Sequence, residues 1–569
     1  MKRIVLIFIV LIAVGAIIFF DRGENSDRSA SEPKNSENIP SVIIPHFDLA
    51  KTNRQAFLND LKTKIDPKKI AIVSPNHQDL GQTDIITTDQ NWDFSNLKPK
   101  VNTDLFSKLS SNHTILGDST VFQNEHGIRN VFPEIAVAFP NAEFLPIILK
   151  SKTSQTEIDN LHSQLDLNCP DCLIVASVDF SHYNPNSLAQ IHDSFSIKAL
   201  NNLDETKILQ TETDCPQALY LAIKWAKAKN ASKFNLVKND NSGNLAKDDD
   251  LESTSYVIGD YSGGKGDKIT TTGFVIAGDT MFDRNVYHNY KDAGLVHLFD
   301  NLGNRVFWGA DVKLVNLEGP ISAKPIDDDW QSGSLVFNFP PEATKILSYL
   351  KLNSVSLANN HTMNNGQAGF ANTQKVLGIA GIDMVGTQEG FSENNLLKFN
   401  AEIPISYIAV NEFSSQNEDA IANMIKREKT AGRFVILMPH WGTEYENKHN
   451  ANQSYLAYGW INSGADLVIG SHPHVTQDFE IYKGKPIIYS LGNFVFDQYF
   501  SKRTQEGLII GGIITNKSLR LTFLPFKSVV SKPRLMTGAE KTAKIKTVLD
   551  IDAQNGFTKV NSDTIELSL

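Results

Sequence analysis

The sequence is poor in cysteine and contains no long run of basic residues. Three cysteines in 569 residues exclude a fold held together by many disulfides. A net charge of -10 argues against nucleic acid as the main partner, because nucleic-acid-binding domains concentrate Lys and Arg on one face. The hydrophobic fraction of 41% and the charged fraction of 21% are ordinary for globular proteins, and the length predicts two large domains.

The amino-terminal residues contain a long stretch without charge. Lys2 and Arg3 precede Ile4–Phe20, a segment at the short end of the length that spans a bilayer. No small-residue cleavage site is evident before Asp21, which favours an uncleaved anchor over a signal peptide. We therefore predict a transmembrane anchor over residues 1–22 and a single-pass protein of the cell membrane, with its amino end in the cytoplasm and its bulk outside. A cleaved signal would give the same compartment without the anchor.

Shifts in composition divide the remaining chain. Residues 23–40 are polar and predict a disordered tether. A Gly-rich linker at residues 263–268 separates the two domains. The predicted boundaries are 41–262 for the first domain, 269–530 for the second domain and 531–569 for a carboxy-terminal extension. Apolar runs alternate with helical stretches, which indicates α/β folds.

Three apolar runs in the first domain each lead to a histidine. These histidines are His46, His77 and His182. Ligands of α/β sheets gather beyond the carboxyl ends of the strands, so we expect the three side chains to line one pocket. Cys215 precedes a predicted helix and could add a thiolate ligand to that pocket.

The first domain also contains a set of short phrases in a fixed order. PHFD, SPNH, EHGI, DFSHY and TDCPQAL resemble the Memo family, also called AmmeMemoRadiSam system protein B. The resemblance implies a fold similar to class III extradiol dioxygenases and a pocket that could hold iron or copper. By resemblance, the pocket residues are His46, His77, His182 and Cys215. The chain departs from the family after Glu125-His126, where it has Arg129 and Asn130.

Cys169 and Cys172 form a C-x-x-C pair. Outside the cytoplasm a small disulfide is the expected state. A zinc site would need two more ligands, and a redox role lacks a thioredoxin-like context.

Five apolar runs in the second domain end in residue types that bind metals. The residues at these ends are Asp279, Glu318, Asn360, His361, His440, His472 and His474. Carboxylates, amides and imidazoles suit Mn²⁺, Zn²⁺ or Fe²⁺. His472 and His474 stand two residues apart where a strand enters a loop, so both rings can face one point. A polar turn without a metal remains the alternative for this pair alone, and the other strand ends favour a metal site.

Six longer phrases in the second domain occur in a recognisable order. GDTMFDR, VNLEGPIS, ANNHTMNNG, HWGTEY, GADLVIGSHPHV and YSLGNFVFDQ resemble the CapA family of capsule or poly-γ-glutamate synthesis proteins, which is similar to calcineurin-like metallophosphoesterases. The resemblance implies an α/β sandwich of two packed sheets flanked by helices. It also implies metal-dependent phosphoester hydrolysis, in which two cations hold the phosphoryl group and acidify a water.

The resemblance assigns roles to individual residues. The implied metal ligands are Asp279, Glu318, Asn360, His440, His472 and His474, with Glu318 as the bridging carboxylate. His361 would act as the general acid, and Arg284 would hold an anionic substrate group. The residues expected to shape the pocket or to hydrogen-bond the ligands are Trp441, Glu444 and Asn493.

Three functional hypotheses follow. The preferred one is a membrane-anchored, extracytoplasmic metal-dependent hydrolase in cell-surface polymer synthesis. The second is a non-catalytic polymer-binding scaffold, favoured because Met281 replaces a superfamily His and Asn364 replaces a frequent family Asp. The third places the chemistry in an iron or copper redox pocket of the first domain. The expected partners are the lipid bilayer, an anionic polymer or its precursor, and other polymer-synthesis membrane proteins.

Overall fold

Three β-sheets organise the residues that the computed structural model describes, which are 37–94, 97–111, 114–248, 252–323, 335–415, 417–550 and 556–569. The first domain holds a nine-stranded mixed sheet with the order β5-β3-β6-β2-β7-β1-β9-β8, and β4 pairs with β6. Its strands are β1 (Ser41–Ile44), β2 (Lys69–Pro75), β3 (Ile85–Thr87), β4 (Lys100–Val101), β5 (Ile115–Gly117), β6 (Glu143–Leu149), β7 (Leu173–Ser177), β8 (Lys233–Asn241) and β9 (Ser255–Ser262). Its α-helices are α1 (Lys51–Lys64), α2 (Thr103–Ser110), α3 (His126–Arg129), α4 (Phe132–Ala138), α5 (Gln155–Asn168), α6 (Asn186–Asn201), α7 (Glu205–Ile208), α8 (Pro216–Ala228) and α9 (Ser242–Ala246).

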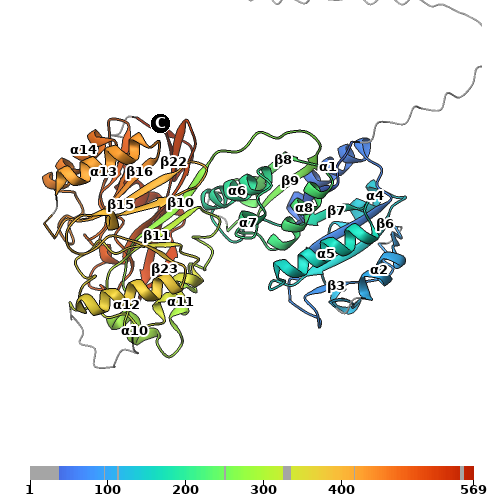
Figure 1. Ribbon diagram of the computed structural model, residues 1–569, viewed down its shortest axis with the longest axis horizontal. Coiled ribbons are helices and arrows are strands. Elements are labelled where there is room, and N and C mark those ends of the chain that lie inside the picture. Colours follow the sequence, from blue (N-terminus) through green and yellow to red (C-terminus); the bar gives the residue numbers. More distant parts are fainter. Residues whose placement is uncertain are drawn as a thin grey trace, which may run out of the picture. The chain divides into compact units, whose positions relative to one another are not determined.

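Helices bury both faces of this sheet. Along β2, Ala71 and Val73 pack in one hydrophobic cluster with residues of α5 and α8, while Ile70 and Ile72 pack in another with residues of α1 and α4. This alternation follows from the two-residue period of a strand. Continuous apolar runs are therefore the sequence pattern of this sheet, and Figure 1 shows α5 and α8 against its strands.

The second domain contains two sheets. The ten-stranded sheet has the order β13-β12-β11-β10-β21-β22-β25-β24, with β20 on β10 and β23 on β22; the six-stranded sheet has the order β14-β15-β16-β17-β19-β18. The strands are β10 (Thr272–Thr280), β11 (Val312–Leu317), β12 (Ser354–Ser356), β13 (Asp383–Val385), β14 (Leu396–Phe399), β15 (Ile405–Asn411), β16 (Phe434–His440), β17 (Leu467–Ile469), β18 (Phe479–Tyr482), β19 (Lys485–Ile488), β20 (Asn493–Val495), β21 (Glu506–Ile514), β22 (Ser518–Val529), β23 (Lys532–Leu535), β24 (Thr558–Lys559) and β25 (Thr564–Ser568). The α-helices are α10 (Arg284–Tyr290), α11 (Ala343–Tyr349), α12 (Gly366–Ile379), α13 (Glu418–Thr430), α14 (Ala451–Ser463) and α15 (Gly538–Leu549).

Hydrophobic clusters show how these two sheets are layered. One cluster joins Ile276 of β10 to Tyr407 of β15 and Ile436 of β16, so it lies between the sheets. The helices α13 and α14 cover the six-stranded sheet, beside β15 and β16 in Figure 1. Residues 531–569, predicted to be an extension, supply β23, α15, β24 and β25, and β25 pairs with β22 inside the larger sheet.

The predictions of fold class and location need correction. Both included a transmembrane anchor, and the segment proposed for it, Ile4–Phe20, lies outside the described residues. Among the residues from Glu37 onward that the structure describes, no helix is both long and apolar enough to cross a membrane. The longest of them, α6, has 16 residues, whereas a span needs about 20. The described chain consists instead of mixed α/β sheets covered by helices.

The C-x-x-C pair is closed in the structure. Cys169 and Cys172 form a disulfide at the end of α5, and Cys215 is a free, buried cysteine.

Candidate metal centres in the two domains

Strand ends from both sheets of the second domain bring the six predicted ligands together. Asp279 lies near the end of β10, opposite Asn493 of the parallel neighbour β20. Glu318 directly follows β11, and His440 is the last residue of β16. His440 also pairs with Ser471, in the loop that follows β17. The predicted ligands therefore converge because parallel strands deliver their carboxyl ends to one edge.

Two carboxylates and one imidazole form the centre of this cluster. Asp279, Glu318 and His474 are buried, and one ligand atom from each lies within 4.8 Å of the others. Nε2 of His474 is 3.8 Å from Oε1 of Glu318, and its Nδ1 is 3.5 Å from Oδ2 of Asp279. Oε1 of Glu318 is buried and has no hydrogen-bond partner among the described residues. A buried carboxylate oxygen without a partner is costly, so this donor set fits a divalent cation.

The remaining predicted ligands contact one another and form a second part of the site; they are Asn360, His440 and His472. Nε2 of His440 lies 2.9 Å from Oδ1 of Asn360 and 3.2 Å from Nδ1 of His472. The backbone N–H of His472 donates to Oδ2 of Asp279 over 3.1 Å, which joins the two parts. Burial, strengthened by the neighbouring imidazoles, lowers the pKa of His440 well below its ordinary value and the pKa of His472 to about 3. Both rings are therefore neutral, the form that binds metals.

An asparagine that the sequence analysis did not select holds the two carboxylates. Nδ2 of Asn316 donates to Oδ1 of Asp279 over 2.8 Å and to Oε2 of Glu318 over 3.2 Å. Its own Oδ1 accepts a hydrogen bond from Nδ2 of Asn359 over 3.1 Å. The signal was present in the phrase VNLE, because residues two apart on a strand point to the same face.

Asn493 orients one of the histidines. Its Nδ2 donates to Oε1 of Gln498 and to the carbonyl oxygen of Thr504, both at 3.0 Å. The Oδ1 atom is then the acceptor facing Nδ1 of His474 at 2.9 Å. A proton on Nδ1 leaves Nε2 of His474 with its lone pair on the side of Glu318, as a metal ligand requires.

The other two residues expected to support the site differ in position. A carboxylate oxygen of Glu444 lies within 4.8 Å of ligand nitrogens of His472 and His474, so it belongs to the cluster. Trp441 is fully buried, stacks on Trp460, and donates from Nε1 to the carbonyl oxygen of Tyr489 over 2.9 Å. It therefore acts as packing beneath the site.

The two residues predicted to act on substrate already have partners. The Arg284 guanidinium pairs with Asp497, with Nε 3.2 Å from Oδ2, and lies over the ring of Phe337. Asp497 was missed, although it belongs to the quoted phrase YSLGNFVFDQ. Nδ1 of His361 lies 3.0 Å from Oδ1 of Asn364, and its ring stacks on Phe337 with centroids 4.2 Å apart.

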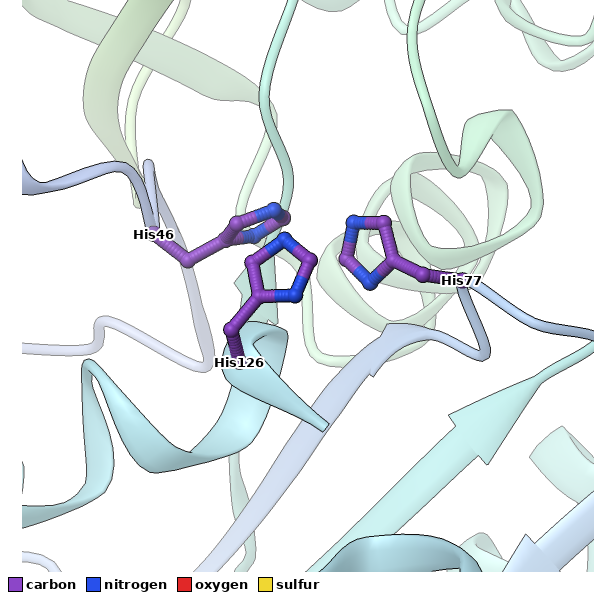
Figure 2. A group of neighbouring side chains, drawn as sticks. All are labelled: His46, His77 and His126. Atoms are coloured by element: carbon purple, nitrogen blue, oxygen red, sulfur yellow. The ribbon is translucent and has the colours of Figure 1, made fainter. Parts of the chain in front are cut away.

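A second cluster of imidazoles lies in the first domain. Figure 2 shows the rings of His46, His77 and His126 directed toward one another. Nitrogen atoms of the three rings lie within 4.8 Å of one another, and the rings of His77 and His126 stack with centroids 3.8 Å apart. His126, the first residue of α3, was not among the predicted ligands, although the quoted phrase EHGI contains it.

Carboxylates surround these imidazoles. Nε2 of His46 lies 3.2 Å from Oδ2 of Asp179 and 3.1 Å from Oδ2 of Asp214. Burial would lower the pKa of His46, but the two carboxylates outweigh it and raise this pKa. For His77 burial likewise opposes the shift, and Asp214 and Glu125 raise its pKa to about 9. Asp179, Asp214 and His46 also form a candidate metal group of their own.

The last two predicted ligands of this pocket lie farther from its centre. Nε2 of His182 is 4.0 Å from Oδ2 of Asp214, and its buried Nδ1 has no hydrogen-bond partner in the described part of the chain. Cys215 packs in the hydrophobic core, and burial raises the pKa of its thiol far above the ordinary value. A protonated thiol is a poor metal ligand, and the preceding Asp214 is the residue that faces the imidazoles.

The fold and these two clusters define a class of protein: two α/β domains, each with imidazoles and carboxylates gathered at strand ends. Residues 273–498 match the family model described as bacterial capsule synthesis protein PGA_cap, and residues 25–258 match the family model described as Memo-like protein. The second domain is therefore similar to capsule synthesis proteins and the first to Memo-like proteins, as the motifs predicted.

Individual relatives agree with this division. The capsule biosynthesis protein CapA of Bacillus anthracis is 27% identical over 325 residues, which cover 53% of this chain and 78% of that protein. The PGA biosynthesis protein CapA of Bacillus subtilis strain 168 is 28% identical over 261 residues, 43% of this chain and 67% of the relative. A MEMO1 family protein of Caldivirga maquilingensis is 25% identical over 179 residues, 30% of this chain and 63% of the relative.

Proposed function

We propose that this protein acts in the synthesis of a capsule or poly-γ-glutamate polymer, and that its second domain is a metal-dependent hydrolase of the phosphoesterase type. The names of the CapA relatives support the first part. The single observation that carries the second part is the buried group of Asp279, Glu318 and His474. A bound divalent cation would supply charge stabilisation and an acidified water there.

Different residues of the protein would have different roles at this centre. Asp279, Glu318 and His474 would hold one metal, and Asn360, His440 and His472 would hold another, with Glu318 shared. Asn316 fixes the carboxylates, and Asn493 fixes the tautomer of His474. Nδ1 of His361 is engaged by Asn364, so its Nε2 is the atom that would deliver a proton to the leaving oxygen.

His472→Ala tests the hydrolase directly. We expect the full-length protein to hydrolyse a chromogenic phosphodiester with added Mn²⁺, and the variant to be slower by at least about 100-fold, because a ligand is lost. The measurement is the steady-state rate together with the bound metal per protein. His297→Ala, an exposed histidine beside Asp300, is the matched control and should keep the rate. A protein that binds no metal, or a variant as fast as the parent, would refute the hydrolase proposal.

A non-catalytic scaffold is the second candidate function, favoured by two specific observations. The Met281 side chain packs in the hydrophobic cluster of the larger sheet and contributes no ligand of the imidazole type. The partner of His361 is the neutral amide of Asn364, which supports a proton on the ring less than a carboxylate would. Polymer binding by a protein that takes up no metal would favour this alternative.

The first domain offers a redox pocket as a third candidate. The cluster of His46, His77 and His126 supports it, since imidazoles bind iron and copper. We expect His77→Ala to lower the copper bound by the full-length protein by at least about tenfold, because the variant loses an imidazole that Glu125 orients. Elemental analysis measures this. Equal metal content in His77→Ala and in the His297→Ala control would rule the pocket out.

A further inference from the structure

A cleft with an excess of positive charge opens beside the candidate metal centre of the second domain. Its volume is about 530 Å³, and α15, β22 and the loop after His474 contribute to its walls. The cations that line it are Lys448, Lys502, Arg503, Lys527 and Lys544. The carboxylates that line it are Asp478, Glu506 and Glu540.

The carboxylates of the cleft are already engaged. Asp478 lies 3.5 Å from Nζ of Lys448, and Glu506 lies 3.1 Å from Nζ of Lys544. Glu540 pairs with Arg534, outside the lining. Within the described ranges, Arg503 and Lys527 have no carboxylate within ion-pair distance, and Lys527 interacts with Glu540 only over a longer distance. These two cations are therefore available to an anionic ligand.

The wall of the cleft includes neighbours of residues at the metal centre. Its wall includes Val475, the residue directly after His474. The other link is the short helix η5 (Arg503–Gln505), because the carbonyl oxygen of Thr504 accepts the hydrogen bond from Nδ2 of Asn493. Asn493 in turn holds His474. A chain bound in the cleft would therefore lie against chain neighbours of the residues that position the site.

From this geometry we infer that the cleft binds a stretch of a polycarboxylate chain and guides it toward the metal centre. The inference rests on the proposed role in polymer synthesis. A polymer such as poly-γ-glutamate carries one carboxylate per residue, and several cations along one cleft match such a repeat better than a single small anion. Arg503 contributes a planar fork that suits a carboxylate, and Lys527 contributes a point charge.

The double variant Arg503→Glu/Lys527→Glu tests the cleft. We expect the full-length variant to bind fluorescently labelled poly-γ-glutamate at least about tenfold more weakly than the parent, with metal content unchanged, because both free cations are reversed. The readout is fluorescence anisotropy at low and at physiological salt. The matched control is Lys375→Glu/Lys426→Glu, which changes net charge equally on α12 and α13, away from the cleft, and should stay within about twofold of the parent.

Each other outcome overturns the inference. Unchanged binding in the cleft variant, or an equal loss in the control, would mean that the cleft is not the binding site. Tighter binding of a poly(glycerol phosphate) chain than of poly-γ-glutamate would refute the polycarboxylate as occupant. The same titration with His472→Ala separates the two proposals, because polymer binding should survive there even if the hydrolase activity is lost.

Discussion

Glu318→Gln is expected to abolish tight metal binding by the second domain without harming the metal-free fold. Glu318 and Asp279 are both fully buried and close together. Burial, reinforced by the charge of Asp279, raises the pKa of Glu318 well above its ordinary value, so in the absence of a cation the Glu318 carboxylate takes up a proton. Glutamine resembles this protonated form, because it keeps the volume and can keep the hydrogen bond from Asn316, but it cannot become a carboxylate that binds a cation. We expect bound metal to fall at least about tenfold, and the metal-free variant to unfold at the same or a higher denaturant concentration than the parent.

Elemental analysis and denaturant unfolding, each with and without Mn²⁺, measure these two effects. In the parent, added metal should raise the unfolding midpoint, because the ion binds only the native site. In Glu318→Gln this increase should vanish. The matched control Glu389→Gln changes an exposed carboxylate and should leave both quantities unchanged. A variant that keeps its metal would show that Glu318 is not a ligand.

Gly470→Ala is expected to lower the stability of the second domain strongly. A Cβ atom at Gly470 would lie 2.1 Å from the carbonyl oxygen of Tyr489 and 2.4 Å from Nε1 of Trp441. The carbonyl oxygen of Tyr489 is a backbone atom directly after β19, and it cannot move without disturbing the sheet. We expect a loss of about 3 kcal/mol in the free energy of unfolding of the second domain, together with weaker metal uptake, because His472 and His474 follow two and four residues later.

Denaturant unfolding followed by tryptophan fluorescence checks this loss, since Trp441 and Trp460 lie in the affected region. Gly459→Ala is the matched control. Gly459 lies within α14, nothing would lie within 4 Å of its Cβ, and alanine in a helix should add about 0.5–1 kcal/mol. Equal stability of the two variants would contradict the proposed close approach at Gly470.

Much of the second-domain site was readable from local patterns. Apolar runs that end in Asp279, Glu318 and His440 predict buried parallel strands, and the structure has β10, β11 and β16 there. Such strands carry their signal locally, because each is a continuous apolar segment with a polar residue at its end. The His-x-His spacing likewise placed His472 and His474 on one loop.

Residues that act through other side chains were harder to select. Asn316 and Asp497 carry polar side chains like many others, and only their partners reveal a role. In the first domain, the side chains of His126 and Asp214 lie at the pocket, but neither residue directly follows an apolar run in the sequence. Cys215 looked like a ligand in the sequence, but the packing of α8 turns its thiol into the core and leaves Asp214 at the pocket.

The sequence by itself determined which segments become strands and which families the two halves of the chain resemble, because hydrophobic period and motif order are local properties of the chain. The tertiary structure alone decided which polar groups meet. Hydrogen bonds such as those of Asn316 and Asn493, and the excess of cations in the cleft beside His474, arise between residues far apart in the chain. Their distances depend on how sheets pair and pack, which no local pattern encodes.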